Sequence, residues 1–395
     1  FGRLPIWKYG SSCKEITAKR NDSKGGNMMN RFEMPEYRHP DFSQDLFVNA
    51  PDAKYEAAEK DGVAPENFHS TSMYPEYFKI DGKWKLAEES RMDSCVVYCE
   101  DGHLAVVEAR NLKKGDRVIT GRTERCEEGI YMHCHGFEEP GAKLDDQFVF
   151  RQGRSRETSY ARDYDKLFEL LKYEKENGGK VVWVMGPAFA FDADARAAMQ
   201  ALVENGYAQG VLAGNALATH DLEGALLHTA LGQDIYTQES QPNGHYNHLD
   251  VLNKVRRSGS IPQFIEDYKL DDGIICSCVK HNVPFVLAGS IRDDGPLPEV
   301  IGNVYDAADA MRGLVRNATT VICMATMLHT IATGNMTPSF RVLEDGTIRP
   351  VYLYTIDIDE FVVNKLLDRG SLCATTMVTN VQDFITLVAK GLGVQ

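Results

Sequence analysis

The feature that most constrains this chain is an alternation of short apolar runs and longer helix-like segments in its carboxyl-terminal part. Strands separated by helices of about 10 to 15 residues imply βαβ units, which build a parallel sheet with helices on both faces. We therefore expect an α/β fold with a Rossmann-like nucleotide-binding domain. The apolar runs that predict its strands include KVVWVMG, GVLAG, PFVLAG, TTVICMAT and VYLYTIDID.

The remaining sequence indicates two further parts before this domain. Residues 1–65 are polar and loop-rich, which predicts an extended arm or cap. Residues 66–155 carry short β-rich runs separated by D-G and K-G-D turns, a spacing typical of a small β-barrel or sandwich. Residues 156–395 then form the nucleotide-binding domain, which begins with a helix-like segment from Ser159 to Asn177.

Composition excludes several classes of partner. The 395 residues include 57 acidic and 43 basic side chains, so the net charge of −14 argues against nucleic acid and anionic membrane surfaces. No apolar run approaches the roughly 20 residues of a membrane span, and no signal peptide is visible. Nine scattered cysteines fit reduced thiols better than a disulfide framework. We expect a cytoplasmic protein whose partner is a small molecule.

The stretch PFVLAGSIRDDGPLP predicts a ligand-binding loop. Its apolar start is typical of a buried strand, and the glycines and prolines that follow indicate a turn. Arg292, Asp293 and Asp294 should therefore lie at the carboxyl end of a strand, where open α/β sheets bind their ligands.

A further acidic residue, Asp357, ends the strand expected within the run VYLYTIDID. Dinucleotide-binding folds place an acid at this point to hydrogen-bond the adenosine ribose, and such an acid favours NAD over NADP. A solvated aspartate capping the next helix is the alternative interpretation. The usual G-x-G-x-x-G motif is absent. The G-x-G formed by Gly391 and Gly393 lies at the end of the sequence and is not followed by a helix. Another loop must then hold the phosphates.

Two segments, GVLAGNALATHD and VICMATMLHTIATGN, each predict a strand that enters a small-residue turn and then a helix. Backbone N–H groups at such helix starts attract phosphate and carboxylate oxygens. Asn215 and Ala216 lie at the first turn, and Thr326 to His329 lie at the second. Tight strand–helix packing would produce the same pattern.

Histidines give only weak indications of a metal site. His245 and His248 stand three residues apart without a third matching ligand, which is more typical of structural or substrate-contacting residues. His133 and His135 share one face of an extended run, again without a partner cluster. No metal is assigned.

Several segments together resemble the NAD-dependent ornithine cyclodeaminases of archaea and cyanobacteria, often catalogued as the bifunctional lysine-ketoglutarate reductase/saccharopine dehydrogenase conserved-region family. The resemblance covers about residues 60–395. The segments that carry it are GNALATHDLEG, GHYNH with NKVRRSGSI, PFVLAGSIRDDGPLPEV, ATMLHTIATGN and PENFHSTSMYP.

This resemblance implies a deoxyhypusine-synthase-like NAD-binding domain and conversion of L-ornithine to L-proline and ammonia. NAD would take a hydride from Cα and return it to a cyclic imine, so that no net reduced cofactor forms. Family members often have Asp where this chain has Asn380. The cofactor contacts implied by position are Asn215, Ala216, Asp293, Thr326, Met327, Leu328, His329, Asp357, Asn380 and Val381.

The same chemistry needs proton-transfer groups and a cation for the substrate carboxylate. We assign proton transfer to Asp294 and His245, and substrate binding to Arg292, Arg256 and His248. The fold relatives also imply a homo-oligomer, either a dimer or a tetramer, with sites near subunit interfaces.

Other functions stay open from the sequence. A NAD-dependent amino-acid or opine-type (saccharopine-like) dehydrogenase would release reduced cofactor rather than recycle it. Lysine in place of ornithine adds one methylene, which a pocket discriminates by only about 1 to 3 kcal/mol. A non-catalytic NAD-sensing protein would release no ammonia from any diamino acid.

Overall fold

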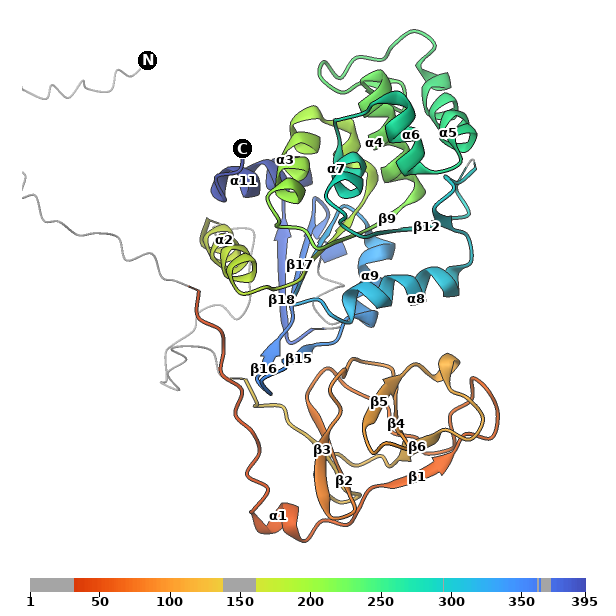
Figure 1. Ribbon diagram of the computed structural model, residues 1–395. Helices are drawn as coiled ribbons and strands as arrows, with labels where there is room; N and C mark the ends of the chain where they lie inside the picture. Colours follow the sequence, from red (N-terminus) through yellow and green to blue (C-terminus); the bar gives the residue numbers. More distant parts are fainter. Residues whose placement is uncertain (1–31, 138–160, 294, 361, 364–370) are drawn as a thin grey trace, which may run out of the picture. The chain divides into compact units, whose positions relative to one another are not determined.

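The computed structural model describes residues 32–137, 161–293, 295–360, 362–363 and 371–395. Its carboxyl-terminal domain contains a parallel sheet whose strand order is β13-β12-β9-β8-β14-β17-β18 (Figure 1). The sheet confirms the expected α/β, Rossmann-like fold. Its strands are β8 (Val181–Met185), β9 (Gly210–Gly214), β12 (Phe285–Ala288), β13 (Val300–Ile301), β14 (Thr320–Met324), β17 (Tyr352–Asp357) and β18 (Cys373–Val378).

Helices cover both faces of this sheet because its strands bury both sets of side chains. In β8, Val181, Trp183 and Met185 belong to one core cluster, and the alternating Val182 and Val184 belong to another. The first face packs against α2 (Ala161–Glu176), α3 (Ala193–Glu204), α4 (Asn215–Leu227), α5 (Asn247–Ser258), α6 (Ile261–Tyr268), α7 (Ile274–Lys280) and α11 (Val381–Gly391), and the second packs against α8 (Val304–Val315). Helix α9 (Met327–Met336) lies beside α8 (Figure 1).

The chain changes direction across the sheet between β8 and β14. From β8 it adds β9, β12 and β13 on one side, and it then returns to place β14 on the other side of β8. Ligands of open α/β sheets bind outside the carboxyl ends of the strands at such a switch point. The fold therefore predicts a site where β8 and β14 end. Short elements η2 (Pro187–Phe191), η3 (Gly244–Tyr246), β10 (Thr229–Ala230) and β11 (Gln233–Asp234) lie in the connections of this domain.

The amino-terminal part forms two antiparallel sheets, with strand orders β1-β6-β4-β5 and β3-β2-β7. Phe78 and Ile80 of one sheet share a core cluster with Val96 and Ile119 of the other, as expected for a small sandwich. The elements are α1 (Asp45–Val48), β1 (Lys54–Ala57), β2 (Glu76–Ile80), β3 (Lys83–Leu86), β4 (Cys95–Tyr98), β5 (Leu104–Val107), η1 (Ala109–Asn111), β6 (Arg117–Thr120) and β7 (Ile130–Met132).

One strand of this module lies upstream of residue 66, where the sequence placed the module's start. Lys54 to Ala57 pair with Thr120 to Arg117 in antiparallel register, so the sheet extends to residue 54. The pattern missed this strand because its residues are exposed and its stretch contains no apolar run. The division of the chain into three parts otherwise stays a prediction.

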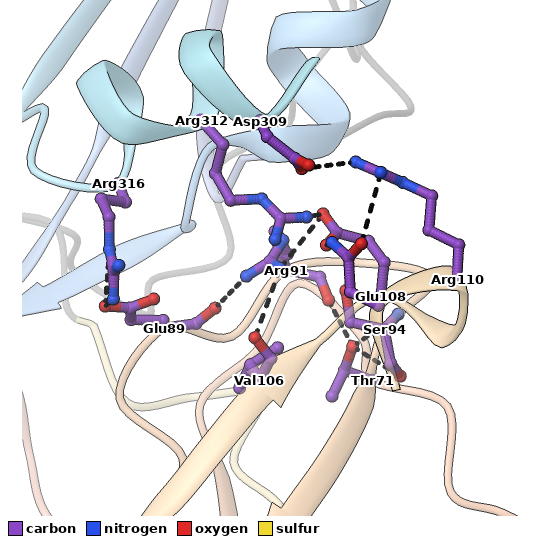
Figure 2. Close-up of polar contacts among 11 residues, drawn as sticks. Thr71, Glu89, Arg91, Ser94, Val106, Glu108, Arg110, Asp309, Arg312 and Arg316 are labelled. Atoms are coloured by element: carbon purple, nitrogen blue, oxygen red, sulfur yellow. Dashed lines mark hydrogen bonds and ion pairs between the residues drawn. The ribbon is translucent and has the colours of Figure 1, made fainter. Parts of the chain in front are cut away.

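Ion pairs join the β-rich module to α8 and the residue that follows it (Figure 2). Arg110 donates to Asp309 at 2.7 Å, and Arg316 donates to Glu89 at 2.6 Å. Beyond α9, a hairpin of β15 (Phe340–Val342) and β16 (Ile348–Pro350) begins beside Ser339, whose N–H donates to the carbonyl of Ser90 at 3.1 Å. Within the described residues, no helix combines the length and apolar character needed to cross a membrane.

Candidate active site

The loops that follow β8 and β14 touch each other at the switch point. Gly186 N–H donates to the carbonyl of Met324 at 2.9 Å, and a Cβ at Gly186 would overlap the carbonyl oxygen of Ala325. Ala325 adopts a left-handed backbone conformation, with φ of 52°, which is strained for a residue with a side chain. Such strain often marks a functional site. The two loops are therefore packed tightly against each other at the predicted ligand position.

Two helices start at this edge without a side-chain cap. Helix α4 follows Gly214, which has no side chain to cap it, and α9 follows Thr326, whose side chain does not bond the first-turn N–H groups. At the same edge, α8 and α11 are capped by the side chains of Asn303 and Asn380. The backbone N–H groups at the start of α4 and α9 thus form a donor set that fits the phosphates of a dinucleotide.

His329 lies where these two helix starts approach each other. Its Nδ1 is 3.2 Å from the hydroxyl of Thr326, and its Cε1 is 3.1 Å from a Cβ built on Gly214. Burial lowers the pKa of His329, and the nearby carboxylate of Asp293 opposes that effect. The structure therefore brings together three of the predicted segments: the starts of α4 and α9 and the loop after β12.

The loop after β12 is held by contacts from two helices. Within it, Asp293 accepts the Ser290 N–H at 2.8 Å. From α4, the Asn215 side-chain oxygen accepts the Leu297 N–H at 3.0 Å, and from α5, Arg256 donates to the carbonyl of Pro296 at 3.0 Å and 3.2 Å. Asn215 and Arg256 therefore position this loop, whatever direct contact they make with a ligand.

The predicted cofactor contacts at the ends of β17 and β18 differ in exposure. Asp357 is partly buried, and one carboxylate oxygen accepts the Asp359 N–H at 3.0 Å. Asn380 is exposed and its amide oxygen caps α11, which leaves the amide nitrogen for a ligand. Val381 is 5% exposed and packs in the core, so its contact with a cofactor would come from its backbone.

The other residues that the sequence predicted for proton transfer and substrate binding lie in different elements. Arg292 is exposed on the loop after β12. His245 is exposed in η3, where its ring lies 4.2 Å from the ring of Tyr246, and His248 is partly buried at the start of α5. Asp294 lies outside the described residues. The roles of all four stay predictions.

A buried carboxylate that the sequence pattern did not single out links two of the motifs. Glu223 of α4 accepts a hydrogen bond from the Thr229 hydroxyl at 2.8 Å, and Asn247 donates to that same hydroxyl at 2.8 Å. Glu223 also lies 3.1 Å from Nδ1 of His220. The signal that could have found this pair is the i, i+3 spacing of His and Glu within GNALATHDLEG.

A second buried carboxylate fixes the position of α4. Asp221 is 0% exposed and accepts hydrogen bonds from Arg196 at 2.9 Å and from the N–H groups of Ile274 and Ile275 at 3.1 Å and 2.8 Å. Burial lowers the pKa of Arg196, and the carboxylates of Asp221 and Asp272 more than offset this, so the pKa is raised. These contacts of Asp221 join α3, α4 and α7.

One group of potential metal ligands occurs in the described part of the chain. Cys99, Asp101 and His103, on the turn between β4 and β5, place their ligand atoms within 4.8 Å of one another. Lys85 Nζ lies 2.6 Å from the carbonyl of Gly102 on the same turn and brings a positive charge to it. We assign no metal role to this group.

Comparisons with known proteins place the chain in a family. A family model described as arginine dihydrolase ArgZ-like, C-terminal, Rossmann fold matches residues 165–388. The ornithine cyclodeaminase of Methanocaldococcus jannaschii is 38% identical over 359 residues, which are 88% of this chain and 80% of the relative. The chain belongs to the ornithine cyclodeaminase family. This membership confirms the resemblance that the sequence motifs indicated.

Two solved structures are also similar to this member of the ornithine cyclodeaminase family. A conserved LOR/SDH protein from Methanococcus maripaludis is 34% identical with a TM-score of 0.77, and the match covers 87% of this chain and 98% of that chain. AgrE, solved in a ternary complex with ornithine and NAD+, is 32% identical with a TM-score of 0.55. That match covers 89% of this chain and 47% of AgrE, so this chain spans about half of AgrE.

Proposed function

We propose that this protein is an ornithine cyclodeaminase, which converts L-ornithine to L-proline and ammonia. The observation that carries the proposal is the switch point, where the uncapped starts of α4 and α9 meet Asp293 and His329 in a member of this family. A relative, AgrE, has been solved with ornithine and NAD+. The same pair of ligands is proposed for this chain.

NAD fits the donor set at this edge. The helix starts supply N–H groups for the phosphates, and Asp357 supplies an acid for the adenosine ribose that repels the 2′-phosphate of NADP. When bound, NAD supplies the acceptor and then the donor of a hydride at the substrate Cα. The proposed contacts are Asn215, Ala216, Asp293, Thr326, Met327, Leu328, His329, Asp357, Asn380 and Val381.

The substrate needs a carboxylate to bind its distal ammonium, a cation to bind its carboxylate and a group that accepts a proton from its α-ammonium. The loop after β12 carries Arg292, which is exposed and able to reach a carboxylate. Asp294 is proposed as the carboxylate for the distal ammonium, because the sequence pattern places it in the ligand-binding loop and the family resemblance supports a role in proton transfer. His245 is proposed as a second proton-transfer group. Arg256 and His248 are proposed as further substrate-binding residues, with Arg256 also anchoring the loop through Pro296.

The cellular setting is part of the proposal. None of the cysteines that the structure describes forms a disulfide, which favours a reducing compartment such as the cytoplasm. Formation of proline from ornithine would place the protein in proline biosynthesis and in arginine and ornithine metabolism. We propose a homo-oligomer, a dimer or a tetramer, as its working state.

The test is to incubate the full chain with ornithine and a catalytic amount of NAD, and to identify the products by mass. We expect proline and ammonia in equal amounts, no net accumulation of reduced nicotinamide, and slower turnover when NADP replaces NAD. Accumulation of reduced nicotinamide would instead indicate an amino-acid or opine-type dehydrogenase, and faster turnover of lysine would indicate a lysine cyclodeaminase. No product from any diamino acid would contradict an enzymatic function.

A further inference from the structure

We propose that His220 is the group that accepts a proton from the α-ammonium of the substrate, and that Glu223 positions it. This inference rests on the proposed function and names a proton acceptor for it. The two side chains stand one turn apart on α4, with Nδ1 of His220 3.1 Å from Oε2 of Glu223. The His220 side chain is 12% exposed, and that of Glu223 is 0% exposed.

The environment of Glu223 keeps its carboxylate charged. Burial raises the pKa of Glu223, but hydrogen bonds from His220, the Gly232 and Leu231 N–H groups and the Thr229 hydroxyl outweigh burial, so the pKa is lowered. The three partners other than His220 approach to between 2.8 Å and 2.9 Å. An ionised carboxylate can only accept hydrogen bonds, so Nδ1 of His220 must carry the proton. Nε2 of the neutral ring is then the acceptor.

His220 stands beside the switch point and beside the GHYNH motif. Its ring lies 5.4 Å from the ring of Phe191, which ends η2 in the loop that leaves β8. His248 of α5 also lies near it, with the two ring centres 6.2 Å apart. The imidazole is therefore close both to the loop that leaves β8, where the ligand is expected, and to the helix that carries proposed substrate residues.

The carboxylate of Glu223, in the motif GNALATHDLEG, also links this motif to GHYNH. Thr229 links Glu223 to Asn247, at the start of α5, through two hydrogen bonds of 2.8 Å. Gly232 and Gly244 are in such close contact that a Cβ on either would overlap the backbone of the other. His245, by contrast, is exposed and lies against Tyr246. Because the carboxylate of Glu223 holds its ring in place, His220 is better positioned to accept a proton than His245.

The proposed step balances in atoms and charge. One N–H bond of the substrate α-ammonium breaks as a bond forms between that proton and Nε2 of His220. The amine keeps the electron pair, which would form the C=N bond of an iminium ion as the Cα hydride passes to the NAD of the proposed function. The imidazolium is stabilised by the carboxylate of Glu223. After the δ-amine has formed its bond to the substrate Cα, the bond from that carbon to the α-nitrogen breaks. The proton on the imidazolium then passes to the departing ammonia, which leaves as ammonium, and His220 is neutral again for the next turnover.

The test compares His220→Gln and His220→Asn with the unaltered full chain, using ornithine and NAD. Both variants should lower kcat by roughly 10²- to 10⁴-fold, the range expected for a lost proton-transfer group, with NAD affinity within about twofold. His281→Gln is the matched control, because His281 is exposed at the end of α7. Added imidazole should restore part of the turnover of His220→Ala, which a purely structural role would not allow.

Glu223→Gln tests the positioning role. The amide cannot fix the Nδ1–H form of His220, so kcat should fall while the KM for ornithine changes little, and Glu223→Asp should recover part of the loss. A kcat within threefold of the unaltered protein in the folded His220 variants, or no rescue by imidazole, would overturn the inference and leave the proposed function intact. Absence of ornithine turnover in the unaltered protein would overturn the proposed function, and this inference with it.

Discussion

Gly186→Ala is expected to weaken NAD binding by about 100-fold and to reduce turnover at least as much, because small misplacements at a site can cost that factor. The added Cβ would overlap the Ala325 carbonyl oxygen, a backbone atom that no rotamer change can move. Gly186 has φ of −81° and ψ of 172°, which alanine adopts freely, so the effect is purely steric. The two loops at the switch point must separate, and the start of α9 moves with them.

The matched control is Gly302→Ala, at the carboxyl end of β13 on the same edge of the same sheet. A Cβ at Gly302 has no neighbour within 4 Å, so this variant should bind NAD as the unaltered protein does. Isothermal titration with NAD, beside thermal melting to establish that both variants fold, makes the comparison. Unchanged NAD affinity in folded Gly186→Ala would place the cofactor away from the switch point.

Asp221→Asn is expected to lower the free energy of unfolding by about 3 to 5 kcal/mol, the cost of leaving one member of a buried ion pair without its partner. The substitution keeps the side-chain volume but removes the charge that faces Arg196, which is 1% exposed. It also sets an amide nitrogen against an N–H donor, because both Asp221 oxygens accept from the backbone of α7. Arg196 would keep its hydrogen bond to the backbone carbonyl of residue 221, but its remaining carboxylate partner would be Asp272, whose side chain is 40% exposed.

Asp194→Asn serves as the control for this substitution. Asp194 lies in the first turn of α3, two residues before Arg196, and it is exposed. Loss of its charge should cost no more than about 1 kcal/mol, the upper part of the range for an exposed acid near a helix start. Urea titrations of the three proteins measure the difference. Equal stability of the Asp221 and Asp194 variants would show that the buried ion pair does not hold α3, α4 and α7 together.

The parallel sheet could be predicted from the sequence because strands buried on both faces form continuous apolar runs. Val181 to Met185 and Thr320 to Met324 are examples, since every side chain in these strands is buried. Strand β1 could not be predicted in the same way, because all four of its residues are exposed and only pairing with β6 makes it a strand.

The candidate site was predictable as a set of loops but not as a network. Motifs placed Asn215, Asp293 and His329 at strand ends, and the structure brings these segments together. The buried role of Glu223 was not predictable, because a glutamate in a helix is usually exposed and its partners follow the end of α4. Val381 was assigned by resemblance, and its side chain belongs to the core.

The mass of proline formed from ornithine that carries deuterium at Cα tests the central claim most directly. If the hydride leaves Cα and returns to the same carbon of the cyclic imine, the proline should retain one deuterium at that carbon, and catalytic NAD should suffice. Treatment that removes bound NAD should stop the reaction, and added NAD should restore it. Proline that has lost the deuterium to solvent would indicate simple proton abstraction and would contradict internal hydride transfer.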